Sequence, residues 1–377
     1  MGAKKIFAIF ACATAAILGV SFAIFPFCEH KINWDVVAGK TASIAAGANC
    51  PEIAADLVKS IKYGQFAAKA NARIALFHNK KFGEIGAKNF IRSCGKNFDF
   101  EEYEARLMLE GIAKEPDFAS GFFKMKYMPQ IRALKNPYLK AVLYYSLSLR
   151  TKNPDSEKYA KTAFGILKAQ PRCENKQQAF IEIAQMAFEK KRYADIVEAA
   201  RLCPGGANYY AAFFGFLKDA EFYEYSRKAE EDYWCKRVFS YRQRLKSTKD
   251  PLNSGDALRY TALRLDYNWI TNNYRDFNIP TLAYISHVFG DAKSLAFYKQ
   301  YALSAENIKR NLGSEFGYLN AAATYFAAMG DFEASYEILN MVKDPHKKLK
   351  MLNGIVPNLK GGRQAIADFA NYLKSAK

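Results

Sequence analysis

Apolar side chains recur with the period of an α-helix, and this pattern restricts the fold more than any other feature of the chain. Between residues 177 and 203 two such stripes follow each other, separated only by the charged segment 189–192. The first stripe has the spacing i, i+3, i+4, i+7, i+8 and comprises Phe180, Ile183, Ala184, Ala187 and Phe188; the second comprises Tyr193, Ile196, Val197 and Ala200. Two apolar faces joined by so short a turn can bury each other only by folding back. The pattern predicts an antiparallel helical hairpin.

The same arrangement occurs earlier in the chain. Residues 77–85 (FHNKKFGEI) align without a gap with residues 188–196 (FEKKRYADI), and both second helices finish at an Arg-x-Cys sequence. Further hairpins are predicted at residues 138–170, around 289–292 and at 315–343, and no sustained period-2 alternation indicates a strand. The expected fold class is therefore all-α.

The last of these hairpins resembles a tetratricopeptide repeat. The resemblance rests on small residues against an aromatic one at 322–325 (AATY), a Gly-Asp-aromatic turn at Gly330, Asp331 and Phe332, and a closing Pro345. The resemblance implies an α-solenoid of antiparallel hairpins that binds other proteins on its concave face. The alternative is a helical bundle without a functional groove.

The first residues predict delivery to a membrane. Lys4 and Lys5 precede an uncharged run over residues 6–27, which as a helix would be about 33 Å long and would span a bilayer core. We expect residues 1–28 to be a transmembrane anchor, with a signal peptide cleaved after Ala23 as the alternative. Small residues at every fourth position (Ala11, Ala15, Gly19 and Ala23) would also permit self-association of this segment.

The remainder is divided into a short spacer at residues 29–48 and a helical-repeat solenoid at 49–377, with a subdivision near 245–255. A helix is expected to begin at Asn49-Cys50-Pro51-Glu52, where Asn49 would cap it and Pro51 suits its first turn.

The chain is strongly basic. Its 55 Lys and Arg against 37 Asp and Glu give a net charge of +18. The densest basic patch comprises Lys236, Arg237, Arg242, Arg244, Lys246 and Lys249. Such patches also occur in nucleic-acid-binding proteins, but an exported chain rarely meets nucleic acid. We therefore expect no nucleic-acid partner, and we read the patch as a solvated helix face or a site for an acidic partner or lipid phosphate.

Catalytic, cofactor-binding and metal-binding residues are not recognisable. The four histidines (His30, His78, His287 and His346) do not share metal-ligand spacing, and no nucleophile elbow or phosphate loop is present. Glu182 and Glu315 are the carboxylates that a helical lytic glycosidase acting on envelope polymers would use, although their flanking sequences resemble those of solvent-facing residues.

An oxidising compartment permits disulfides among Cys50, Cys94, Cys173, Cys203 and Cys235. Cys173 and Cys203 flank the clearest hairpin at the same end and are the best candidate pair, with Cys50 and Cys94 as a second pair. Five buried thiols are the alternative.

These observations favour a non-enzymatic scaffold that binds other envelope proteins. The absence of any Asn-x-Ser/Thr acceptor favours the bacterial periplasm, with the chain anchored in the inner membrane or secreted after cleavage of a signal. An accessory part of a flagellar motor, pilus or secretion system is expected. The envelope-polymer glycosidase and a ligand or lipid carrier with a large closed cavity are the alternatives.

Overall fold

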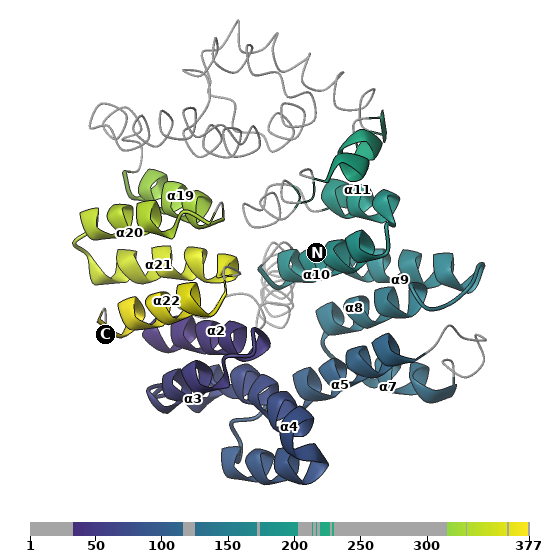
Figure 1. Ribbon diagram of the computed structural model, residues 1–377, viewed down its shortest axis with the longest axis horizontal. Helices are drawn as coiled ribbons and strands as arrows, with labels where there is room; N and C mark the ends of the chain where they lie inside the picture. The colour runs from purple at the N-terminus through teal and green to yellow at the C-terminus, as the bar shows by residue number, and fades with distance from the viewer. Residues whose placement is uncertain are drawn as a thin grey trace, which may run out of the picture.

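A computed structural model describes residues 33–115, 125–171, 174–202, 213, 216, 219–226, 228–229, 315–328, 330–359 and 362–375. Within these ranges the chain is helical throughout and contains no strand, so the all-α prediction is confirmed (Figure 1). The predicted membrane segment, the hairpin around 289–292 and the subdivision near 245–255 lie outside the described residues. No helix of the described part is long and apolar enough to cross a membrane.

The amino-terminal half consists of helices joined by short turns. The first of them are α2 (Trp34–Gly47), α3 (Pro51–Lys59), the 3₁₀ turn η1 (Gly64–Phe66), α4 (Ala68–Cys94) and α5 (Phe100–Lys114). They are followed by α7 (Met128–Ala133), α8 (Pro137–Ser148), α9 (Asp155–Ala169), α10 (Glu174–Glu189) and α11 (Tyr193–Leu202). Side-chain caps start several of them: the Asn33 side chain accepts a bond from the Val36 amide, and that of Asp99 from the Glu102 amide.

The carboxy-terminal part contains α19 (Glu315–Ala328), α20 (Phe332–Met341), α21 (Pro345–Ile355), the 3₁₀ turn η3 (Val356–Asn358) and α22 (Arg363–Ser375). The pairs expected from the apolar stripes are present, because α10 packs on α11, α8 on α9, and α19 on α20. Asp331 begins the second helix of the last pair, where its side chain accepts a bond from the Ala334 amide.

The hairpin predicted around residues 77–85 is present within α4. Gly83 has φ 70° and ψ −173°, which interrupts the helix. The rings of His78 and Phe90 stack at 4.7 Å, although a straight helix would separate them by about 18 Å. The chain therefore turns back at Gly83, and glycine suits this position because a Cβ atom is strained in the left-handed region.

We expect Gly83→Ala to lower the free energy of unfolding by about 1–2 kcal/mol, because positive φ is costly for residues with a Cβ. A steric clash adds nothing, since no atom lies within 4 Å of the added Cβ. Gly165→Ala is the matched control: its Cβ also meets nothing, and it lies inside helix α9. There alanine should stabilise by roughly 0.5–1 kcal/mol. Urea denaturation of both variants checks the prediction, and equal effects would contradict it.

Helix α2 corrects the predicted spacer. Residues 34–47, which the sequence analysis assigned to a short connecting segment, form a helix that is buried on almost every side. It contacts α3 and α4 on one side and α21 and α22 on the other. A helix surrounded in this way has no polar face, so it lacks the amphipathic stripe on which the prediction depended. The expected Asn49 cap is also wrong, because Cys50 occupies the cap position of α3 and Asn49 has φ 59°.

The end of the chain packs against this first described helix. The indole Nε1 of Trp34 donates to the Leu373 carbonyl at 3.0 Å, and Arg363 of α22 pairs with Glu52 of α3 at 2.6 Å. One apolar cluster accordingly combines α2, α3 and the start of α4 with α19–α22, and a second one combines α5–α11. Figure 1 shows α22 beside α2, with the described carboxy-terminal helices stacked on the amino-terminal ones.

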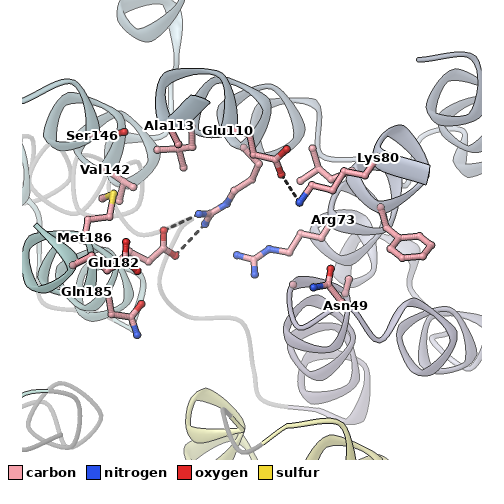
Figure 2. A pocket seen from close by; sticks show the side chains of 17 residues that line it. Asn49, Arg73, Lys80, Glu110, Ala113, Val142, Ser146, Glu182, Gln185 and Met186 are labelled. Atoms are coloured by element: carbon pink, nitrogen blue, oxygen red, sulfur yellow. Dashed lines mark hydrogen bonds and ion pairs between the residues drawn. The ribbon is translucent and has the colours of Figure 1, made fainter. Parts of the chain in front are cut away.

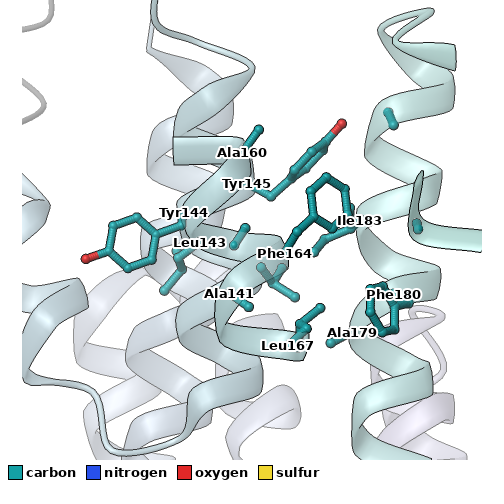
Figure 3. Close-up of a cluster of buried hydrophobic side chains, with 14 of the residues drawn as sticks. Ala141, Leu143, Tyr144, Tyr145, Ala160, Phe164, Leu167, Ala179, Phe180 and Ile183 are labelled. Atoms are coloured by element: carbon teal, nitrogen blue, oxygen red, sulfur yellow. The ribbon is translucent and has the colours of Figure 1, made fainter. Parts of the chain in front are cut away.

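Aromatic side chains fill the second cluster. Tyr145 of α8 and Phe180 of α10 are fully buried, and the rings of Tyr145 and Phe164 meet edge to face at 5.8 Å (Figure 3). The Tyr145 hydroxyl donates to Asp195 at 2.7 Å, which satisfies the polar end of this buried ring.

Candidate functional site

A pocket of about 440 Å³, partly open to solvent, lies where several helix pairs meet. Three helices contribute the same stripe of positions i, i+3, i+4 and i+7. These are Arg73, Leu76, Phe77 and Lys80 of α4; Arg106, Leu109, Glu110 and Ala113 of α5; and Glu182, Gln185, Met186 and Glu189 of α10. The end of α2, Asn49 in the turn that follows it, and two residues of α8 complete the lining. The pocket is therefore built on the face that successive first helices of the pairs have in common.

An ion-pair network forms one wall of the pocket (Figure 2). The Arg106 guanidinium donates to both oxygens of Glu182, with Nη1 2.8 Å from Oε2 and Nη2 3.0 Å from Oε1. Its Nε donates to Glu102 Oε1 at 2.9 Å. Because Arg106 and Glu102 belong to α5 and Glu182 to α10, this bidentate pair joins two helices that are 76 residues apart in sequence.

Glu102 is the buried centre of the network. Only 1% of the residue is exposed, and Arg73 Nε donates to the same Oε1 at 3.0 Å. Burial by itself would raise the pKa of Glu102, but Lys69, Arg106 and Arg73 outweigh it and hold the pKa well below its usual value. Glu102 therefore remains a carboxylate throughout the neutral range.

A second ion pair also lines the pocket. Lys80 Nζ is 2.8 Å from Glu110 Oε1, and Figure 2 shows this pair above the Arg73 guanidinium. The apolar part of the lining comes from Leu76, Phe77, Leu109 and Met186. The pocket thus combines an apolar surface with charges that are held by partners within the protein.

Glu182, one of the two carboxylates named for a glycosidase, lies in this pocket. Burial would raise its pKa, but the Arg106 guanidinium with its hydrogen bonds, and Arg73, outweigh burial and lower the pKa. A general acid needs the opposite, a raised pKa that keeps a proton available at neutral pH. Glu315 is the first residue of α19, in the other apolar cluster, and the structure does not bring the two together.

Neither of the described histidines, His78 and His346, lines the pocket. His78 stacks on Phe90, and burial together with Lys81 lowers its pKa, while His346 is exposed in the first turn of α21. Among the described residues, no group of three His, Cys, Asp or Glu side chains is placed to hold a metal ion.

The predicted bond between Cys50 and Cys94 is not formed in the structure, where both are free thiols. Cys50 is buried in the cluster of α2, α3 and the carboxy-terminal helices, whereas Cys94 packs beside Ala72, Ala75 and Phe98. The turn at Gly83 carries the second half of α4 to a different cluster. Cys173, Cys203 and Cys235 lie outside the described residues, as does the basic patch of Lys236, Arg237, Arg242, Arg244, Lys246 and Lys249.

Sequence analysis missed Arg73, Glu102 and Arg106. The signal that indicates them is spacing: Lys40, Arg73 and Arg106 follow each other at intervals of 33 residues, and Ser146 and Glu182 are 36 apart. Of these recurring cations, Arg73 and Arg106 line the pocket, whereas Lys40 donates to Asn353 of α21 at 2.6 Å.

Comparison with protein-family models gives no match, and comparisons with curated proteins and with solved structures give none either.

Proposed function

We propose that the chain is a non-enzymatic, membrane-anchored scaffold of the bacterial envelope, and that its pocket holds a segment of a protein partner. The observation that carries the proposal is the pocket, built from the matching stripes of α4, α5 and α10. A groove lined by the first helix of each successive pair is the binding surface of helical solenoids.

The stacking of the helices supports a tetratricopeptide-like solenoid. α2 contacts α4, α4 contacts α5, α5 contacts α8, and α8 contacts α10, so each first helix packs on the next. The interval of 33 residues between Lys40, Arg73 and Arg106 is close to the length of a tetratricopeptide unit. An extended binding surface follows from such stacking.

The chemistry of the pocket favours binding over catalysis. Arg106, Glu102 and Glu182 are held in ion pairs, which leaves them poorly suited to transfer protons. The apolar lining at Leu76, Leu109 and Met186 suits a side chain of a partner, and the surrounding charges suit its polar neighbours. An envelope-polymer glycosidase is the second candidate, because Glu110 and Glu182 face one cavity.

Photocrosslinking in cells tests the proposal. A photoreactive phenylalanine at Lys80, in the pocket and 55% exposed, should form one defined protein adduct. The same photoreactive phenylalanine in place of Lys161, which is 82% exposed on α9, should form no such adduct. Gln185→Trp should abolish the adduct, because the indole would fill much of the pocket, whereas Lys161→Trp should leave it unchanged.

The glycosidase reading makes a different prediction. Suppose that Glu182→Gln abolishes the function of the protein in cells, although the variant still folds and still forms the Lys80 adduct. The protein is then an enzyme, and the scaffold proposal is wrong. An adduct that also forms at position 161, or one that survives Gln185→Trp, would remove the pocket as the binding surface.

A further inference from the structure

The start of α2 lies on one edge of the helical array, together with two loops. The Tyr63 amide donates to Asp35 Oδ2 at 2.8 Å, which places the loop after α3 beside the first turn of α2. Asn71 donates from Nδ2 to the Asn97 carbonyl at 2.7 Å, and the Asp99 amide donates to the Ala68 carbonyl. The loop between α4 and α5 is therefore on the same edge.

Exposed aromatic and basic side chains gather on this edge. Tyr63 is 52% exposed and Phe100 is 56% exposed. Lys62 and Lys96 are exposed beside them, and neither forms an ion pair with a described carboxylate. We call Lys62, Tyr63, Lys96 and Phe100 the Tyr63 edge.

The opposite edge has a different character. It is formed by the turn at Gly83, where Phe82 and Ile85 are exposed by 55% and 75%. Among its cations, Lys80 pairs with Glu110 at 2.8 Å and Lys88 pairs with Glu84 at 2.6 Å, whereas the exposed Lys81 lies over the rings of Phe77 and Phe82. Both edges thus expose apolar rings or chains, but two lysines of the Tyr63 edge, Lys62 and Lys96, form no ion pair with a described carboxylate, against one, Lys81, on the opposite edge.

The length of the chain before α2 decides which edge lies near the membrane. The uncharged run ends at Phe27 and the described residues begin at Asn33, the cap of α2, so residues 28–32 are the link. Fully extended, it reaches about 21 Å. The segment of α4 from Ala68 to Phe82 is itself about 21 Å long, so the Phe82 side could touch the bilayer only with the link stretched to its limit.

We propose that the Tyr63 edge rests on the membrane surface and binds the phosphate groups of anionic lipids. Lys62 and Lys96 contact the phosphates, while the rings of Tyr63 and Phe100 enter the interface, where aromatic side chains are favoured. This orientation rests on the membrane anchoring proposed above. The pocket is then held away from the lipid and open to the partner.

Crosslinking to lipid tests the orientation in the full chain. A photoreactive phenylalanine replaces Tyr63 or Phe100 on one edge, and Phe82 or Ile85 on the other, in vesicles of phosphatidylglycerol and phosphatidylethanolamine. We expect lipid adducts at positions 63 and 100 to exceed those at 82 and 85 by about tenfold. Lys62→Glu with Lys96→Glu should reduce them by about 25-fold or more, because each of the two lysines contributes roughly a fivefold gain in binding near an anionic surface.

The matched control is Lys81→Glu with Lys88→Glu, which changes the same charge on the opposite edge and should leave the adducts unchanged. Equal adducts on both edges, or equal adducts in phosphatidylcholine vesicles, would overturn the proposal. Extraction of the chain from vesicles by alkaline carbonate would overturn it as well, because the anchor is its premise. The Lys80 crosslink to a protein partner is a separate measurement, so the scaffold proposal can stand or fall independently.

Discussion

Arg106→Met should lower the free energy of unfolding by about 3–5 kcal/mol, because it leaves two carboxylates without their shared partner in a largely buried site. Glu102 is 1% exposed, and the Glu182 side chain is 17% exposed. Methionine retains most of the volume of arginine, so the effect reports the missing charge and hydrogen bonds. Urea denaturation followed by circular dichroism measures it.

The matched control removes a cation from a surface pair. Lys88→Met breaks the exposed pair with Glu84 and should cost less than about 1 kcal/mol. The double variant Arg106→Met with Glu182→Leu should recover much of the lost stability. It removes the carboxylate that has lost its partner, and Glu102 is still paired with Arg73 and Lys69. A loss from Arg106→Met no greater than that of Lys88→Met would show that the network does not stabilise the fold.

Phe369→Ala should cost about 3–5 kcal/mol and should loosen a helix more than 300 residues away in the sequence. Phe369 is fully buried in the cluster that joins α22 to α2, where Trp34 also bonds to Leu373. The cavity left by the lost ring weakens the packing of α2. Hydrogen–deuterium exchange of residues 34–47 should therefore accelerate together with that of residues 363–375.

Lys374→Ala is the control for this variant. It removes a cation near the end of α22 that is paired with Asp56. Because the Lys374 side chain is 40% exposed, its loss should leave the hydrogen–deuterium exchange of α2 unchanged. If Phe369→Ala accelerated exchange in α22 alone, the two ends of the chain would not stabilise each other as the structure indicates.

Amphipathic stripes predicted those helix pairs whose two helices are adjacent in sequence and half exposed. The stripe from Phe180 to Phe188 and that from Tyr193 to Ala200 appear as α10 and α11, and the turn at 77–85 appears in α4. In each case the information is local, because an apolar face and a short polar turn suffice to indicate a hairpin. Residues 6–27 lie outside the described residues, so their length and apolar character support the membrane anchor only as a prediction.

The pocket could not be predicted in the same way. Arg73, Arg106 and Glu182 are charged residues on three separate helices, and each alone reads as part of a solvated face. Their meeting depends on how α4, α5, α8 and α10 stack, which is a property of side-chain packing between pairs. The recurrence of Lys40, Arg73 and Arg106 at 33 residues was the available signal, and it becomes interpretable only once the pairs are known to stack.

By itself the sequence determined the all-α class and the pairing of neighbouring helices, because helical periodicity and turn residues act over a few positions. The tertiary structure decided three further features: the helix at 34–47, the separation of Cys50 from Cys94, and the packing of α22 on α2. Each depends on contacts between residues far apart in the chain. A helix covered on all sides carries no stripe, and two cysteines at helix ends meet only if every intervening turn directs them together.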